Sequence, residues 1–469
     1  MAEIIDIIIW IIFLFCVSIM SAYLLLAAIS ITGLKKYLKK NSFSDYNSIL
    51  NSPLAPPISI IAPAYNEGKT IVDNAKSLLA LHYNNFEVLI INDGSKDDTL
   101  QKLIEAFDLK KIDTPLTILI PCQEIRGIYK SSNPAFKKFS VIDKANGGKA
   151  DALNAGINVA SAPYITCIDV DCVLEQDSLI KMVKPFLEET KKRVIASGGV
   201  VRIANSCEIE NGKLINVEVP DTFIARVQVL EYIRAFLLGR MAWSRMDGLL
   251  LISGAFGMFD KEIVIKAGGY YHKTVGEDME LVVRMRRYMH DHNLPYTVTY
   301  IPDPLCWTEA PEDFKILGRQ RSRWTRGTIE TLWLHREMLL NPKYKILGLL
   351  SYPFWLVYEY LAPIIEAVGL IFTIFLACVG LINWHFFFLL LIFVYSFAIL
   401  FSMLSLLTEE TTFYQYTKRK DYLKLIYAAL LEPVIFHPFV VYSAIKGNID
   451  MIKGKKTWGD MTRKGLSKQ

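Results

Sequence analysis

Long apolar runs near both ends of the chain enclose a middle part in which short apolar runs alternate with polar ones. Residues 4–31 are apolar apart from Asp6 and small polar side chains, and such a run is long enough to cross a bilayer core of roughly 30 Å. The last third holds three more apolar stretches, at residues 346–382, 384–407 and 423–445. The pattern therefore predicts a folded middle domain joined to membrane segments.

The middle part has the pattern of an α/β domain. Predicted helices are residues 67–81 and 99–107, and predicted buried strands are residues 58–62, 86–92, 116–120 and 164–170. Strands that alternate with helices favour a parallel sheet with helices on both faces. Because ligands of such sheets bind at the carboxyl ends of the strands, polar residues at those ends are candidate site residues.

Three predicted strands end in such residues. Pro63 to Glu67 follow the first strand, Asp93 follows the second, and Asp169 and Asp171 stand at the end of the fourth. The two last carboxylates are two positions apart, so in a strand they share a face, and they repel each other unless a cation lies beside them. Oxygen ligands favour Mg²⁺ or Mn²⁺. An acidic surface strand would show the same triplet, but the apolar run before it favours the cation site.

A glycine pair precedes a lysine in the segment 144–156. Gly147 and Gly148 allow a tight turn, and the helix predicted after them would attract anions at its N-terminus. Lys149 could then reach a phosphate as a point charge. The alternative is an ordinary glycine turn with a solvated lysine. The segment lacks the spacing of the ATPase phosphate loop.

At this point the chain resembles the processive members of glycosyltransferase family 2, the polysaccharide synthases that make cellulose, chitin, hyaluronan and poly-N-acetylglucosamine. The resemblance covers about residues 56–335 and keeps the family's order of motifs. The matching motifs are Pro63-Ala-Tyr-Asn-Glu67, Asn92-Asp93-Gly-Ser95, Gly147-Gly148-Lys149, Asp169-Val-Asp171, Ser253-Gly-Ala-Phe-Gly257, Gly276-Glu-Asp278 and Gln320-Arg-Ser-Arg-Trp324.

The resemblance implies a GT-A-like fold, here an α/β domain with a Rossmann-like mixed sheet, together with α-helical transmembrane segments. It also implies roles for single residues. Asp278 matches the general base and Asp171 the metal ligand, and Asp93 resembles the aspartate that contacts uracil. The implied donor-binding residues are Ala64, Glu67, Asp93, Lys149, Asp169 and Arg323, and the implied acceptor-binding residues are Glu277, Gln320 and Trp324.

Elementary chemistry supports these roles independently. An inverting transfer needs a base for the acceptor proton and stabilisation of the departing diphosphate. Asp278 opens a helix predicted over residues 276–288, whose N-terminus favours an ionised carboxylate. Trp324 fits either a platform for a sugar ring or an anchor at the membrane interface, and its place in the motif favours the platform.

Composition and charge agree with a soluble domain joined to membrane helices. Hydrophobic residues make up 52% and charged residues 21%, and the net charge of +5 is too mild for a nucleic-acid surface. Basic residues at positions 35, 36, 39 and 40 follow the first apolar run, which predicts an external N-terminus and a cytosolic domain. The seven cysteines show no metal or disulfide spacing, which favours a reducing compartment.

The domain prediction is a transmembrane helix at 1–34, a basic linker at 35–55, the GT-A-like domain at 56–310, interfacial helices at 311–345, C-terminal transmembrane segments at 346–447 and a basic cytosolic tail at 448–469. Three points stay open. First, the amphipathic stretches 227–244 and 314–340 fit either helices that lie on the bilayer surface or helices that pack into the core of the domain. The stretch 346–382 is a kinked span or a re-entrant piece followed by a span. The stretch 423–445 has basic flanks on both sides, which favours a hairpin or interfacial segment over a simple crossing.

Three membrane carboxylates, Glu359, Glu366 and Glu432, either line a path for an exported chain or lie at helix ends. The predicted function is inverting transfer from a UDP-sugar, with UDP-N-acetylglucosamine favoured, to a growing β-linked polysaccharide that is translocated across the inner (plasma) membrane. Partners are the donor, the polymer, the bilayer and accessory membrane or export subunits, without nucleic acid. Alternatives are a non-processive transferase acting on polyprenyl phosphate and an inactive membrane scaffold or receptor.

Overall fold

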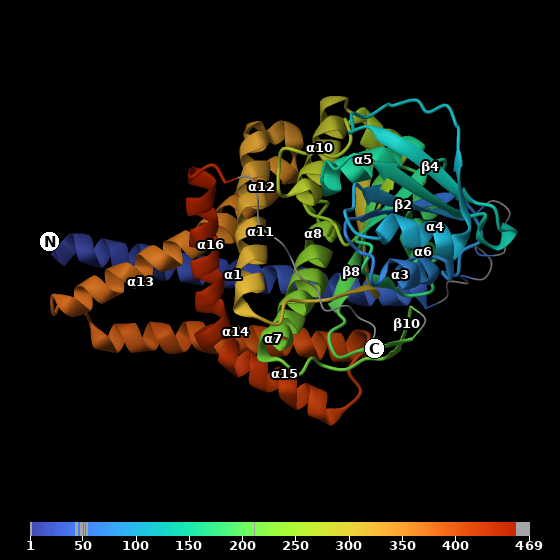
Figure 1. Ribbon diagram of the computed structural model, residues 1–469. Helices are drawn as coiled ribbons and strands as arrows, with labels where there is room; N and C mark the ends of the chain where they lie inside the picture. Colours follow the sequence, from blue (N-terminus) through green and yellow to red (C-terminus); the bar gives the residue numbers. More distant parts are fainter. Residues whose placement is uncertain are drawn as a thin grey trace. The chain divides into compact units, whose positions relative to one another are not determined.

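The computed structural model describes residues 2–42, 46, 50, 52, 55–210 and 212–455. Parts of the predicted linker at 35–55, and residues 456–469 of the predicted basic tail, lie outside the described residues. The chain divides into two compact units, which we treat separately (Figure 1). The α/β unit comprises Lys39–Glu218 and Leu249–Ala310, and the helical unit comprises Met1–Leu38, Val219–Gly248 and Pro311–Thr462.

The α/β unit is built on a ten-stranded mixed sheet in the order β3-β4-β5-β2-β1-β6-β11-β8-β12-β7. The strands are β1 (Ile58–Ala64), β2 (Phe86–Asp93), β3 (Leu109–Ile112), β4 (Ile125–Ser131), β5 (Phe139–Lys144), β6 (Tyr164–Ile168), β7 (Val173–Leu174), β8 (Arg193–Ile203), β11 (Phe256–Asp260) and β12 (Tyr296–Thr308). Strands β5, β2, β1 and β6 run parallel, whereas β11 is antiparallel to both of its neighbours. The sheet is therefore mixed, as the predicted fold class states, and not wholly parallel.

Helices and a small hairpin complete this unit. They are α3 (Ile71–Leu79), α4 (Thr99–Phe107), η1 (Pro134–Phe136), α5 (Lys149–Val159), α6 (Ser178–Glu188), α9 (Lys261–Lys266) and α10 (Glu277–Asp291), with β9 (Glu208–Glu210) pairing with β10 (Lys213–Asn216). The buried strands are apolar on nearly every residue, as expected for strands covered on both faces. Gly156 of α5 lies against Ile61 and Ile91, so this helix packs closely on β1 and β2.

One predicted strand, residues 116–120, is wrong. The segment forms no strand, and Ile118 and Leu119 are 51% and 56% exposed. Its backbone instead binds a side chain of α5: the Asn158 Oδ1 accepts the N–H groups of Leu119 and Ile120, both at 3.0 Å. Because these donors are satisfied by a side chain, the segment needs no strand partner.

The helical unit contains α1 (Ala2–Asn41), whose last residues belong to the α/β unit, and the remaining membrane-type helices. The other elements are α7 (Phe223–Tyr232), η2 (Ile233–Arg240), α8 (Met241–Arg245), α11 (Phe314–Leu334), η3 (Arg336–Met338), η4 (Pro342–Tyr344), η5 (Leu347–Ser351), α12 (Tyr352–Phe354), η6 (Trp355–Leu361), α13 (Ala362–Cys378), α14 (Trp384–Thr412), α15 (Arg419–Leu431), η7 (Glu432–Phe436) and α16 (His437–Ile452).

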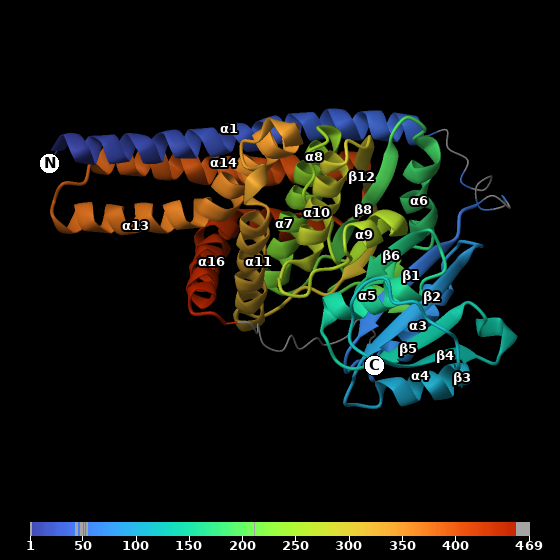
Figure 2. The same cartoon turned by 90° about the horizontal axis from the view of Figure 1, so that it is seen from above.

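Among the described residues, four helical segments are long and apolar enough to cross a membrane: Glu3–Asn41, Leu347–Cys378, Trp384–Thr412 and Arg419–Ile452. Figures 1 and 2 show that α1, α13 and α14 run alongside one another, with the N-terminal end of α1 and the turn between α13 and α14 at the same end. Both views show α16 beside α11, running across that direction. The fourth segment is thus bent, and its second half does not follow the three long helices.

Wide π-helical turns keep three proline-containing segments helical. Such turns are η5 and η6, which are followed within two residues by Pro353 and Pro363, and η7, which contains Pro433. Proline lacks an N–H and clashes with the carbonyl four residues earlier, so a locally wider turn accommodates it. The stretch that could have been a re-entrant piece is consequently helical without a break from Leu347 to Cys378.

The amphipathic stretch at 227–244 packs inside the helical unit. Its elements α7 and η2 lie against α14 and α15, and they bury apolar residues that include Leu230, Ile233, Leu237 and Leu238.

The three membrane carboxylates also meet protein groups within this unit. Their partners are Tyr23 for Glu359 (3.1 Å), His437 for Glu366 (2.7 Å) and Arg234 for Glu432 (2.7 Å).

Candidate active site

Sheet topology brings the candidate residues to one edge of the α/β unit. The carboxyl ends of β5, β2, β1 and β6 share that edge because these strands are parallel. The antiparallel strand β11 begins there, with Phe256 opposite Ile168. At the other end of this row, Asp93 is paired with Lys144. The loops after β2, β5 and β6, and the loop before β11, are therefore neighbours.

A buried lysine organises the loop after β5. Lys144 is fully buried and forms ion pairs with Asp93 and Asp151, both at 2.6 Å. The Asp151 carboxylate also accepts a hydrogen bond from the backbone N–H of Gln123 at 3.0 Å. A buried cation between two carboxylates holds β2, β5 and α5 together, because each carboxylate would otherwise be an uncompensated buried charge.

Asp93 shapes the glycine turn. Its carboxylate accepts the N–H groups of Gly147 (3.0 Å) and Gly148 (2.8 Å) and the side-chain amide of Asn146 (3.1 Å), besides the Lys144 ammonium. Gly148 has φ of +86°, a conformation in which a side chain would be strained. These bonds fix the turn from which α5 and Lys149 begin. The contact with uracil that the resemblance implies for Asp93 stays a prediction.

Replacing Lys144 by methionine should destabilise this unit, because two buried carboxylates would lose their shared cation. We expect the free energy of unfolding to fall by about 3 kcal/mol, measured as a lower Tm of the detergent-solubilised protein. Lys130→Met, at an exposed position of β4, is the control and should leave the Tm unchanged. An unchanged Tm for Lys144→Met would contradict the role given to this ion pair.

Gly254 connects Lys149 to Asp278. Its N–H donates to the Asp278 Oδ2 at 3.0 Å, and its carbonyl accepts from the Lys149 Nζ at 3.2 Å. Lys149 also pairs with Asp169 and lies 3.9 Å from the Glu277 carboxylate. A Cβ on Gly254 would lie 3.1 Å from the Lys149 Nζ. Gly254 thus joins Lys149, which is paired with Asp169, to the first turn of α10.

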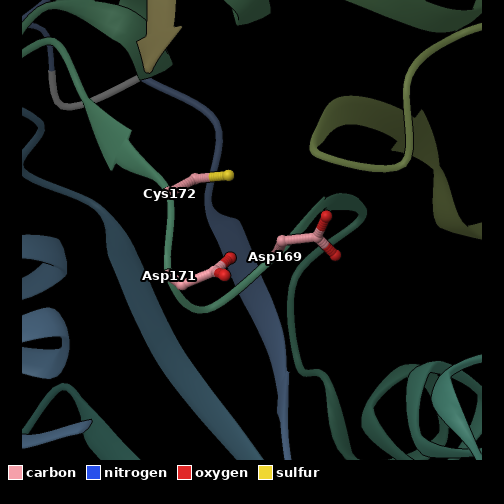
Figure 3. Close-up of side chains that lie close together, drawn as sticks. All are labelled: Asp169, Asp171 and Cys172. Carbon is pink, nitrogen blue, oxygen red and sulfur yellow. The ribbon is translucent and has the colours of Figure 1, made fainter. Parts of the chain in front are cut away.

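Two carboxylates and a thiol gather on the turn between β6 and β7. One ligand atom each from Asp169, Asp171 and Cys172 lie within 4.8 Å of one another, and Figure 3 shows the three side chains on this turn. A hydrogen bond with Cys306 and burial raise the pKa of the Cys172 thiol well above its usual value. Because hard cations prefer oxygen to sulfur, the two aspartates are the candidate ligands for such an ion.

The remaining predicted residues of the α/β unit surround this edge. Ala64 is the buried last residue of β1, beside Asn92. Glu67 follows in the next loop, where its N–H donates to the Thr99 side chain at 2.9 Å. Glu277 is buried at the start of α10, next to Asp278. Lys149 thus contacts Asp169 and Glu277 directly, and it reaches Asp278 through Gly254.

Gln320, Arg323 and Trp324 belong to the other compact unit, on α11. Arg323 is half-buried and Trp324 is 39% exposed. Their meeting with the carboxylates therefore stays a prediction.

Two residues outside the predicted set turn out to organise the site. Lys144 opens the Gly-Gly-Lys segment, and the available signal was a lysine at the end of a buried strand. Gly254 lies within the Ser-Gly-Ala-Phe-Gly motif, in which a glycine at a strand entrance is the signal for a close approach.

Comparisons with known proteins identify glycosyltransferases as relatives of this chain. The family model described as "Glycosyl transferase family 2" matches residues 59–249, and "Glycosyl transferase family group 2" matches residues 164–409. Poly-beta-1,6-N-acetyl-D-glucosamine synthase of Staphylococcus epidermidis is 30% identical over 275 residues, covering 59% of this chain and 55% of the relative. The Staphylococcus aureus (strain COL) protein of that name is 29% identical over 277 residues, with coverages of 59% and 55%. The chain thus spans about half the length of the curated relatives it matches.

A solved structure shares the fold. A mannosyltransferase from Pyrobaculum calidifontis, in complex with GDP-Man and Mn²⁺, superposes with a TM-score of 0.50 at 14% identity. The match covers 93% of this chain and 99% of that one. At this identity the likeness concerns the fold alone, and it confirms the predicted fold class.

Proposed function

The chain belongs to family 2 of the glycosyltransferases, as its motifs predicted, and on that premise we propose that it transfers a sugar from a UDP-sugar to a growing β-linked polysaccharide. The observation that carries the proposal is the link from Asp169 through Lys149 and Gly254 to Asp278. It joins a group suited to a diphosphate with a carboxylate suited to a proton.

In the proposed reaction, an acceptor hydroxyl attacks the anomeric carbon of the donor from the side opposite the diphosphate. Its proton passes to the Asp278 carboxylate as the new carbon–oxygen bond forms. The bond to the diphosphate oxygen breaks, and its electron pair leaves with the nucleoside diphosphate. Lys149 offsets the charge on that leaving group. The configuration at the anomeric carbon is inverted.

The acidic turn fits a divalent cation. Asp169 and Asp171 offer oxygen donors close together, and hard cations prefer such ligands. We propose Asp171 as ligand of Mg²⁺ or Mn²⁺, which when bound would neutralise charge on the diphosphate. The Pyrobaculum calidifontis mannosyltransferase contains Mn²⁺ with its nucleotide sugar. Asp169 belongs to the same cluster as Asp171 and is also paired with Lys149.

Further roles follow the family resemblance. We propose Ala64, Glu67, Asp93 and Arg323 on the donor side, and Glu277, Gln320 and Trp324 on the acceptor side. The favoured donor is UDP-N-acetylglucosamine, because the two staphylococcal relatives are named for a polymer of N-acetyl-D-glucosamine. Accessory membrane or export subunits are part of the same proposal.

The helices support a multi-pass membrane protein of the inner membrane with three crossings. We propose that α1, α13 and α14 span the bilayer and that α16 lies along its cytosolic surface beside α11. An external N-terminus then puts the turn between α13 and α14 outside and both basic flanks of the fourth segment inside, as the positive-inside rule requires. Glu359, Glu366 and Glu432 would line a polar path for the polymer.

Labelling of single cysteines tests this topology. In a chain whose accessible cysteines, Cys16, Cys122 and Cys378, are replaced by serine, Leu381→Cys should react with a membrane-impermeant maleimide in intact cells. Leu381 lies in the turn after α13 and is 52% exposed. Lys420→Cys, in the first turn of α15, should react only after permeabilisation. Labelling of Lys420→Cys in intact cells would contradict three crossings.

The proposed function is tested by supplying membranes that contain the protein with a panel of labelled nucleotide sugars and Mg²⁺ or Mn²⁺. We expect a water-soluble polymer from UDP-N-acetylglucosamine. A single glycosylated lipid would instead identify a transferase for a lipid carrier. No transfer from any donor would overturn the proposal and leave an inactive scaffold.

A further inference from the structure

The guanidinium of Arg321 lies against one face of the Trp324 ring. Arg321 precedes it by three residues on α11, so both side chains lie on the same face of the helix. The Arg321 guanidinium carbon is 4.3 Å from the centre of the Trp324 ring, a cation–π distance. Trp324 is nevertheless 39% exposed. The indole is thus supported from within the helical unit while a large part of it remains accessible.

Arg321 is itself held from a distant part of the sequence. Its Nη1 and Nη2 donate to the two carboxylate oxygens of Glu231 on α7, at 2.8 and 2.6 Å. The arginine side chain is 6% exposed and that of Glu231 24%. Such a bidentate pair fixes the plane of the guanidinium as well as its position.

A second aromatic ring completes this arrangement. Phe436, the last residue of η7, lies 5.9 Å from the same guanidinium carbon. Arg321 therefore joins three elements of the helical unit: α7 through Glu231, α11 through Trp324, and η7 through Phe436. Lysine at this position would keep the charge but lose the paired hydrogen bonds and the flat stacking surface.

Arg321 occupies one of the variable positions of the Gln-x-x-Arg-Trp motif, so the motif itself gives it no role. We propose that Arg321 is a positioning residue that fixes the indole of Trp324 for stacking on the acceptor sugar, and that Glu231 sets the orientation of Arg321. The inference rests on the proposed function insofar as Trp324 binds the acceptor. It concerns acceptor binding and replaces none of the residues proposed for the donor.

The kinetic test compares Arg321→Lys and Glu231→Gln with wild type, using a short oligosaccharide acceptor and the nucleotide sugar found active in the donor panel. We expect a roughly ten-fold rise in the KM for the acceptor, shorter products, and a KM for the donor within about two-fold of wild type. Arg336→Lys is the matched control. Arg336 lies 5.1 Å over the 67% exposed Trp333, so the same exchange there removes the same kind of contact outside the motif.

A second measurement reads the position of Trp324 directly. The protein is labelled with 5-fluorotryptophan, and the ¹⁹F resonance of Trp324 is assigned by its loss in Trp324→Phe. We expect this resonance to shift or broaden in Arg321→Lys and Glu231→Gln and to stay unchanged in Arg336→Lys. This readout needs no acceptor, and a Tm close to that of wild type shows that the variants fold.

The outcomes separate the two proposals. An unchanged Trp324 resonance in both variants would overturn the positioning role. A changed resonance with an unchanged acceptor KM would overturn its link to the acceptor. If wild type transfers no sugar, the proposed function fails, while the fluorine spectrum still decides whether Arg321 and Glu231 hold the indole.

Discussion

Asp278→Asn is expected to lower the rate of sugar transfer by about three orders of magnitude, because a positioned general base contributes 10²- to 10⁴-fold and asparagine cannot take the acceptor proton. The two residues have the same shape. Asparagine can still accept one of the two backbone N–H bonds that Asp278 accepts, from Gly254 at 3.0 Å or from Met279 at 2.8 Å. Donor binding should therefore survive.

The measurement is kcat and the KM for the donor, with labelled nucleotide sugar and purified membranes. We expect a fall in kcat with the donor KM nearly unchanged. Asp73→Asn, at an exposed position of α3, is the control for an isosteric exchange and should keep full activity. Transfer above about a tenth of the wild-type rate in Asp278→Asn would remove this residue from the role of base.

The second large effect is expected at the acidic turn. Asp171→Asn should lower kcat by about a hundred-fold, because a bound cation contributes several kcal/mol of charge stabilisation to the transition state. Chelation of divalent ions should abolish transfer by the wild type, and added Mg²⁺ or Mn²⁺ should restore it. The concentration of ion needed for half-maximal activity should rise in Asp171→Asn.

Cys172 provides the matched control for that prediction. Its thiol belongs to the same cluster as the two aspartates, but sulfur is a poor ligand for Mg²⁺ or Mn²⁺. Cys172→Ser should therefore leave the ion requirement as it is in wild type. An altered ion requirement in Cys172→Ser, with none in Asp171→Asn, would reverse the assignment of ligands.

Three strands at the centre of the sheet, β1, β2 and β6, were predicted from the sequence, whereas the equally buried interior strands β5, β8 and β11 and the edge strand β3 were not. β1, β2 and β6 are continuous apolar runs, and such runs indicate buried strands whatever their neighbours. The edge strand β3 and its neighbour β4 carry lysines, and there pairing depends on the partner strand more than on the residues themselves. The apolar segment 116–120 was wrongly predicted to be a strand. Its backbone N–H groups at Leu119 and Ile120 bind the side chain of Asn158 instead of a neighbouring strand.

Some residues of the candidate site could likewise be predicted from the sequence, and others could not. Chemistry carried by short motifs, such as the pair Asp169 and Asp171, is visible in the sequence because its spacing is local. The partners that hold the motif residues are distant along the chain. Lys144 follows Asp93 by 51 residues and Arg321 follows Glu231 by 90. No local sequence pattern predicts such pairs, because only the packing of the folded chain brings the two residues together.

Gly254 contacts both the lysine proposed to bind the donor and the aspartate proposed as the base. Lys149 cannot turn from Asp169 towards an incoming phosphate without disturbing its bond to the Gly254 carbonyl, and the same residue's N–H holds the Asp278 carboxylate. On the proposed roles, a movement of Lys149 towards the donor would disturb the residue whose N–H holds the proposed base, Asp278. Proton removal would then be synchronised with donor loading, which would protect the activated sugar from wasteful reaction with water.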